Sequence, residues 1–164
     1  MSVIVYRDGV MAADTRAYSG DATPIGHKMK VFRLKDGSLV GFSTTKPGLS
    51  EAMVAWFNAE SPEGPPPVEM NFSALLVKPN GEVFYYNDSI SPSGPLVGPY
   101  FAVGSGDHYA LGALACGAAA AEAVEVACQF DPWCALPVAA LALADASEVQ
   151  NDPSRPPCPE ELNS

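Results

Sequence analysis

The chain has 164 residues, enough for one domain with a substantial core. Its composition, 48% hydrophobic and 17% charged residues, is that of a folded globular protein and excludes a disordered chain. Nine basic and nineteen acidic residues give a formal net charge of −10, which argues against binding to nucleic acid or to anionic membranes. Without a signal peptide or an apolar stretch long enough to span a bilayer, we expect a cytoplasmic protein with free thiols.

The chain begins with Met1 and Ser2, followed at once by an apolar stretch that is expected to form a strand. If Met1 is removed, Ser2 carries both a nucleophilic hydroxyl and a free α-amine. Such an amine has an ordinary pKa of about 7.7–8.0, so it can act as a base near neutral pH without a histidine. The alternative reading is that many proteins start Met-Ser and that the strand serves packing alone.

Three β-hairpins are predicted from turn residues that lie between apolar stretches. The turns contain Asp8-Gly9, Asp36-Gly37 and Asn80-Gly81, whose residues tolerate the positive φ that tight hairpins require. The expected strands are residues 2–7 and 10–14, 30–34 and 39–43, and 74–77 and 83–86. Residues 73–77 are almost continuously apolar, which indicates a strand that is covered on both faces.

Helices are expected between and after these hairpins. The first has the amphipathic spacing of Leu49, Ala52, Met53, Trp56 and Phe57. Thr45 is its candidate N-cap. Two alanine-rich helices are expected at 108–116 and 118–130, the first capped by Ser105 or Asp107.

The remaining segments are connections, a final element and a tail. Residues 60–67 and 87–99, rich in proline, glycine and serine, are predicted to be loops. Residues 136–143 fit either a final strand or a short helix. We expect one domain over residues 1–144 and a disordered C-terminal tail over residues 145–164. The order of the elements fits an α/β sandwich with mostly antiparallel sheets.

Five short segments, taken in order, resemble proteasome β-type subunits and HslV-like peptidases, most of all their small bacterial and phage members. They are Ser2, Ala12-Ala13-Asp14, Lys30-Val31-Phe32, the Ala-Val-Gly-Ser-Gly of residues 102–106 and the Phe-Asp-Pro-Trp-Cys of residues 130–134. The resemblance covers residues 2–143 with a gap after the first helix. It implies the fold of N-terminal-nucleophile (Ntn) hydrolases. This fold is of the α/β (α+β) class and is an αββα sandwich with largely antiparallel sheets.

The resemblance also assigns roles to individual residues. It implies that the Ser2 hydroxyl attacks a peptide carbonyl while the amine of Ser2 accepts the proton. Lys30 would lower the pKa of both groups by its charge, Asp14 would hold Lys30 in place, and Ser105 and Asp131 would orient the amine. From the residues alone, Asp14 and Lys30 fit a structural ion pair equally well, and Ser105 fits a simple helix cap.

Several residues depart from the family's pattern. Ser2 stands where the family has threonine, and Cys134 where it has serine. Thr44 stands at the family's glycine-containing turn; it keeps the backbone N–H of an oxyanion donor, but its Cβ crowds an incoming substrate. Lys28 is expected on the same strand face as Lys30 and is the alternative candidate for the active-site lysine.

One segment is also missing. Residues 60–71 are too few and too rich in proline for the family's long second helix.

The function implied by the resemblance is that of a self-compartmentalising threonine/serine-type peptidase that cleaves polypeptides with Ser2 after Met1 is removed. Such a subunit would form homo-oligomeric stacked rings, hexameric or heptameric, and an ATP-dependent unfoldase partner is implied by analogy only. The alternatives are a catalytically inactive ring-forming structural subunit and a small-molecule amidase. No metal, nucleotide or other cofactor is indicated, because the four cysteines lack metal-ligand spacing and His27 and His108 stand alone.

Overall fold

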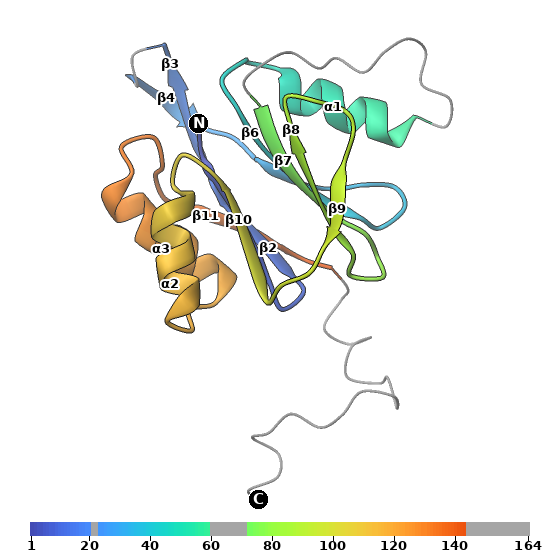
Figure 1. The fold of residues 1–164 in the computed structure, drawn as a ribbon. Coiled ribbons are helices and arrows are strands. Elements are labelled where there is room, and N and C mark those ends of the chain that lie inside the picture. Colours follow the sequence, from blue (N-terminus) through green and yellow to red (C-terminus); the bar gives the residue numbers. More distant parts are fainter. Residues whose placement is uncertain (21–22, 60–71, 144–164) are drawn as a thin grey trace, which may run out of the picture.

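The computed structural model describes residues 1–20, 23–59 and 72–143, which fold into four layers (Figure 1). The two inner layers are antiparallel β-sheets packed face to face. The strands of the first sheet, in spatial order, are β10 (Tyr100–Gly104), β1 (Val3–Arg7), β2 (Val10–Asp14) and β11 (Val138–Ala142). Those of the second are β5 (Val31–Arg33), β6 (Leu39–Thr44), β7 (Phe72–Val77), β8 (Val83–Asn87) and β9 (Ser93–Leu96).

Helices cover the outer face of each sheet. Helix α1 (Leu49–Asn58) packs on the second sheet, whereas α2 (Asp107–Ala115) and α3 (Ala120–Phe130) pack on the first (Figure 1). A separate ribbon of β3 (Arg16–Ser19) and β4 (Thr23–His27) extends beyond the first sheet. The αββα sandwich with antiparallel sheets, as in Ntn hydrolases, is therefore confirmed. No helix in the described part of the chain is long and apolar enough to cross a membrane.

The three predicted hairpins are present as β1–β2, β5–β6 and β7–β8. The ambiguous segment 136–143 forms the strand β11, which pairs with β2. The prediction that residues 87–99 form a loop is wrong in part, because Ser93–Leu96 pairs with β8 as an edge strand. An edge strand made of Ser, Gly, Pro and Leu carries no apolar alternation that would reveal it. The predicted loop 60–67 and tail 145–164 lie outside the described residues.

The predicted helix caps are also wrong. The residue before α1 is Gly48, which has a left-handed φ of 80°. In the turn that leads to this helix, the hydroxyl of Thr44, and not that of Thr45, accepts a hydrogen bond from the Lys46 N–H at 3.0 Å. Gly106 precedes α2 without a side-chain cap. Ser105 does not cap α2 because its hydroxyl bonds elsewhere, to the start of β1.

The two sheets pack closely together at Gly41 in β6. A Cβ added there would lie 2.4 Å from Ile4 Cγ2 and 3.2 Å from Met11 Sδ. We expect Gly41→Ala to lower the free energy of unfolding by about 1–3 kcal/mol through overpacking. Gly112→Ala is the matched control: its Cβ meets nothing within 4 Å on α2, so it should raise stability by about 0.5–1 kcal/mol. Urea denaturation of both variants measures this, and equal midpoints would contradict the packing.

Candidate active site

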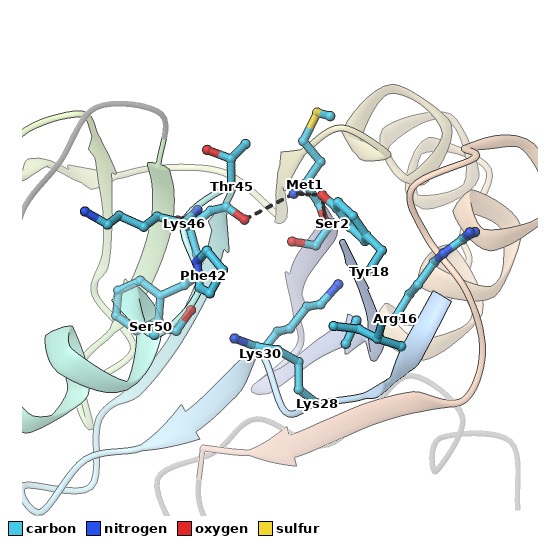
Figure 2. Close-up of a pocket in the computed structure, with 15 residues that line it drawn as sticks. Met1, Ser2, Arg16, Tyr18, Lys28, Lys30, Phe42, Thr45, Lys46 and Ser50 are labelled. Carbon is cyan, nitrogen blue, oxygen red and sulfur yellow. Dashed lines mark hydrogen bonds between the residues drawn. The ribbon is translucent and has the colours of Figure 1, made fainter. Parts of the chain in front are cut away.

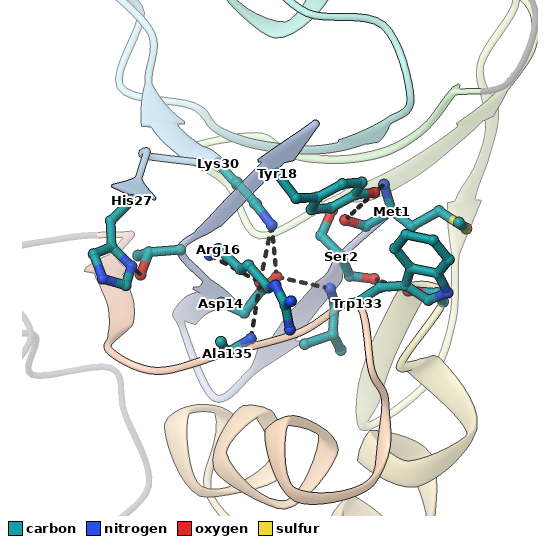
Figure 3. A network of polar contacts seen from close by, with 12 residues as sticks. Met1, Ser2, Asp14, Arg16, Tyr18, His27, Lys30, Trp133 and Ala135 are labelled. Carbon is teal, nitrogen blue, oxygen red and sulfur yellow. Dashed lines mark hydrogen bonds and ion pairs between the residues drawn. The ribbon is translucent and has the colours of Figure 1, made fainter. Parts of the chain in front are cut away.

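Asp14, the last residue of β2, is fully buried and holds several segments together (Figure 3). Its carboxylate accepts hydrogen bonds from the backbone N–H groups of Val3 and Arg16, both at 3.1 Å, and of Ala135 at 3.4 Å. The Lys30 ammonium donates to both carboxylate oxygens, at 3.1 and 2.9 Å. These donors compensate the desolvation of the buried charge and fix its position.

Lys30 lies directly before β5, and its side chain is only 6% exposed. It extends from the second sheet across to Asp14, with its ammonium on the side of Ser2 (Figures 2 and 3). Lys28 instead pairs with Glu51 of α1 at 3.1 Å, and both of these side chains are substantially exposed. The structure therefore brings Lys30, and not Lys28, to Asp14.

Ser2 is 2% exposed and immediately precedes β1. Its carbonyl oxygen accepts hydrogen bonds from the Ser105 hydroxyl and the Gly106 N–H, both at 3.4 Å. Gly104 has a φ of 107°, and a Cβ there would lie 2.0 Å from the Ser2 carbonyl oxygen. The glycines around Ser105 thus permit a close approach of backbone to Ser2 that no larger residue allows.

Asp131 and Cys134 are buried on the turn after α3. Asp131 Oδ1 accepts the Trp133 N–H at 2.8 Å, but Oδ2 has no hydrogen-bond partner among the described residues. Burial, and next the Asp14 carboxylate, raise the pKa of the Cys134 thiol, which therefore stays protonated.

The N-terminal amine is held inside the site (Figure 2). The Met1 ammonium donates to the Tyr18 hydroxyl and, at 3.2 Å, to the Thr44 carbonyl. Tyr18 in turn donates to the Met1 carbonyl at 3.2 Å, and its ring packs on Trp133 with centroids 5.2 Å apart. Burial, and next the charge of Lys30, lower the pKa of this amine below its ordinary value.

Tyr18 was missed by the sequence analysis because it lies on the β3–β4 ribbon, a hairpin that no apolar pattern predicted. The only signal in the sequence that could have drawn attention to Tyr18 is that it is an aromatic residue within a polar segment to which no strand or helix was assigned. Burial, and next Asp14, raise the pKa of its phenol, so the group remains a hydroxyl that both donates and accepts.

A pocket of about 140 Å³ opens beside Ser2 (Figure 2). The β3–β4 ribbon borders it on one side, and the end of β6 with the first turn of α1 borders it on the other. Lys30, Thr44 and Lys28 all line it. Of the residues predicted for the site, Ser2 thus lies in one pocket with Lys30, Thr44 and Lys28, while Asp14 binds Lys30 and Ser105 binds the Ser2 carbonyl. Asp131 and Cys134 flank these residues from the turn after α3.

No protein-family model matches the chain, and no curated protein matches its sequence. Solved structures do match. BPH of Thiobacillus denitrificans matches with a TM-score of 0.63 and 19% identity, over 88% of this chain and 98% of that one. The same protein in complex with epoxomicin matches with a TM-score of 0.63 and 20% identity, over 87% and 98%.

Eukaryotic HslV from Trypanosoma brucei matches with a TM-score of 0.59 and 15% identity, over 86% of this chain and 98% of that one. The chain therefore has the fold of HslV-like, proteasome-type proteins, and the resemblance drawn from the sequence is confirmed at the level of the fold.

Proposed function

We propose that the chain is a subunit of a proteasome-type peptidase in which Ser2, made the N-terminal residue by removal of Met1, cleaves peptide bonds. The observation that carries this proposal is the Lys30 ammonium, held by both oxygens of the fully buried Asp14 and directed to the side of Ser2. An ion pair with a purely structural role would need no nucleophile beside it. Ser2, which directly precedes β1, lines the same pocket as Lys30.

The proposed chemistry starts at the Ser2 hydroxyl. Its oxygen attacks the substrate carbonyl while its proton passes, directly or through a water, to the α-amine of Ser2. The amine returns that proton to the nitrogen of the leaving peptide, and water then hydrolyses the ester formed on Ser2. Lys30 stabilises the developing alkoxide by its charge.

Burial and next the charge of Lys30 lower the pKa of the Met1 amine, and the Ser2 amine, one residue farther along the chain, would be subject to the same two causes once Met1 is removed. A neutral amine has the lone pair that a base needs.

Asp131 Oδ2, for which the described part of the chain provides no hydrogen-bond donor, supports the removal of Met1. A buried carboxylate oxygen without a donor is unfavourable. When Met1 is present, the Ser2 nitrogen is an amide with a single N–H; once Met1 is removed, it becomes an amine with additional donors. We propose that Asp131 and Ser105 orient this amine, and that the Thr44 N–H serves as an oxyanion donor.

Ring assembly in the cytoplasm is part of the proposal. Helices α2 and α3 form an outer layer on which Tyr109 and Phe130, 45% and 60% exposed, stack with centroids 5.6 Å apart. Exposed aromatic residues on packed helices suit a contact between subunits. We propose hexameric or heptameric stacked rings acting on polypeptides, and an ATP-dependent unfoldase remains a proposal by analogy.

The rival proposal is a catalytically inactive ring-forming subunit. Its supporting observation is the pair of hydrogen bonds that the Met1 ammonium donates to the Tyr18 hydroxyl and the Thr44 carbonyl within the pocket. While Met1 is retained, the Ser2 nitrogen is an amide and cannot act as a base.

Substitution of Ser2 separates the two proposals. Ser2→Ala should lower the rate of hydrolysis of fluorogenic peptides by at least about a thousandfold, because it removes the attacking oxygen. Ser2→Thr is the matched control, since it keeps the hydroxyl and should remain active. Hydrolysis by Ser2→Ala at the wild-type rate would refute the assignment of the nucleophile.

A further inference from the structure

The first sheet ends at β10, whose outer edge has no strand beside it among the described residues (Figure 1). On its inner edge β10 pairs with β1, in a register that runs from Val3 with Gly104 to Arg7 with Tyr100. An edge strand directs a row of unpaired N–H and C=O groups away from its sheet. The outer edge of β10 can therefore pair with another extended chain.

The other edges of the two large sheets carry features that discourage such pairing. Strand β9 contains Gly94 and Pro95, and proline cannot donate to a ladder of hydrogen bonds. Strand β5 has three residues, one of which is Arg33. The Arg33 guanidinium also donates to the carbonyls of Ala142 and Leu143 at the end of β11. Strand β10, with the sequence Tyr-Phe-Ala-Val-Gly, has neither a proline nor a charged side chain.

A cavity of about 310 Å³ runs along β10, and all five residues of the strand line it. We call it the β10 groove. Leu75, Tyr85 and Leu96 of the second sheet form one of its walls, and Asp107 and Leu111 of α2 form the other. Because the second sheet and α2 cover opposite faces of the first sheet, the groove reaches both faces of β10.

The shape of the β10 groove suits a single extended segment. Side chains of a strand alternate between its two faces, so those of an added segment would meet the second sheet and α2 in turn. Five residues of strand span about 17 Å, the length of an equally short extended peptide. Because walls stand on both sides of the edge, a lone extended chain fits there better than the edge of a complete sheet from a second copy.

Asp107 gives the β10 groove a negative charge. Among the described residues its carboxylate has one ion-pair partner, the exposed His108 at 3.7 Å, which is charged only when it is protonated. No lysine or arginine of the described chain lines the groove. Arg7 lies over the Tyr100 ring at the opposite end of β10, and its guanidinium donates to backbone carbonyls at and after the end of α2. A basic side chain is therefore the complement that Asp107 lacks.

We propose that the β10 groove binds an extended segment of a partner protein by strand addition. The segment carries apolar residues in alternation, which pack on the wall of Leu75, Tyr85 and Leu96, and a lysine or arginine that pairs with Asp107. Main-chain hydrogen bonds to β10 supply affinity, and the two walls supply specificity. The inference is independent of the chemistry at Ser2, because the groove lies along the edge of β10 that faces away from β1.

The test uses the full chain and two fluorescein-labelled octapeptides of alternating valine and threonine, one with lysine and the other with glutamate at both ends. We expect the lysine peptide to bind at least about tenfold more tightly in fluorescence anisotropy at low salt. Asp107→Asn should reduce this ratio by about threefold or more. Glu125→Gln is the matched control, because it removes an exposed carboxylate of α3 outside the groove and should leave the ratio unchanged. Leu96→Ala should weaken the binding of both peptides alike, since it removes part of the apolar wall.

Hydrogen exchange shows whether the peptide adds as a strand. Saturating lysine peptide should slow the exchange of the outward-directed amides within residues 100–104 by at least about tenfold. Binding without this protection, or equal binding of the two peptides, would overturn the inference. Slow exchange of residues 100–104 without any peptide, together with a concentration-dependent dimer in sedimentation, would assign the edge to a second copy and overturn it as well.

Discussion

Lys30→Met is expected to reduce peptide hydrolysis by at least about a hundredfold while the protein remains folded. The substitution removes the only ammonium that contacts Asp14 among the described residues, but keeps most of the apolar stem. The loss in rate follows because the alkoxide of Ser2 would form without the positive charge beside it. The free energy of unfolding should fall by about 3 kcal/mol, which is at the lower end of the range for breaking a buried ion pair. The loss is at the lower end because three backbone N–H groups still donate hydrogen bonds to Asp14.

Both effects can be measured on one preparation, by steady-state hydrolysis and by urea denaturation. Lys35→Met is the control: Lys35 is exposed on the β5–β6 turn, so its replacement should change neither quantity. A folded Lys30→Met protein with undiminished turnover would mean that the catalytic site has been misplaced.

Asp14→Ala is expected to have the larger effect on stability, about 5 kcal/mol or complete loss of the folded state. It leaves the Lys30 ammonium buried without its partner and also removes the acceptor of the Val3, Arg16 and Ala135 N–H groups. Because a domain of this size is stable by only about 5–15 kcal/mol, such a loss approaches the whole free energy of unfolding.

Asp14→Asn provides the matched comparison for that prediction. The amide keeps one acceptor oxygen and nearly the same shape but has no charge. We expect it to fold with a smaller loss of stability than Asp14→Ala, and to be nearly inactive because Lys30 is no longer held in place. Equal stability of Asp14→Ala and the unmodified protein in urea would show that Asp14 does not organise the site.

The sequence predicted the hairpins because their turns carry chemical signals of their own. Asp8-Gly9 adopts positive φ at both residues, and the apolar strands on either side form the core between the sheets. The β3–β4 ribbon and β9 carry no such pattern: their residues are largely exposed, and their pairing depends on neighbours that the rest of the fold supplies.

The residues themselves indicated only Ser2, through its place next to the initiator methionine. Asp14 and Lys30 were predicted from the resemblance to proteasome β-type subunits, and strand alternation alone could not separate Lys28 from Lys30. The packing of the second sheet against β2 is what brings Lys30 to Asp14. The role of Tyr18 depends entirely on such distant contacts, so no local pattern predicts it.

The intact mass of the purified protein, before and after treatment with a peptide epoxyketone, tests the central claim most directly. An epoxyketone reacts with both the hydroxyl and the free α-amine of an N-terminal nucleophile, so it distinguishes a processed Ser2 from an ordinary serine. We predict a chain that lacks Met1 and gains one inhibitor per subunit, with no gain in Ser2→Ala. A chain that retains Met1 and takes up no inhibitor would contradict the peptidase assignment.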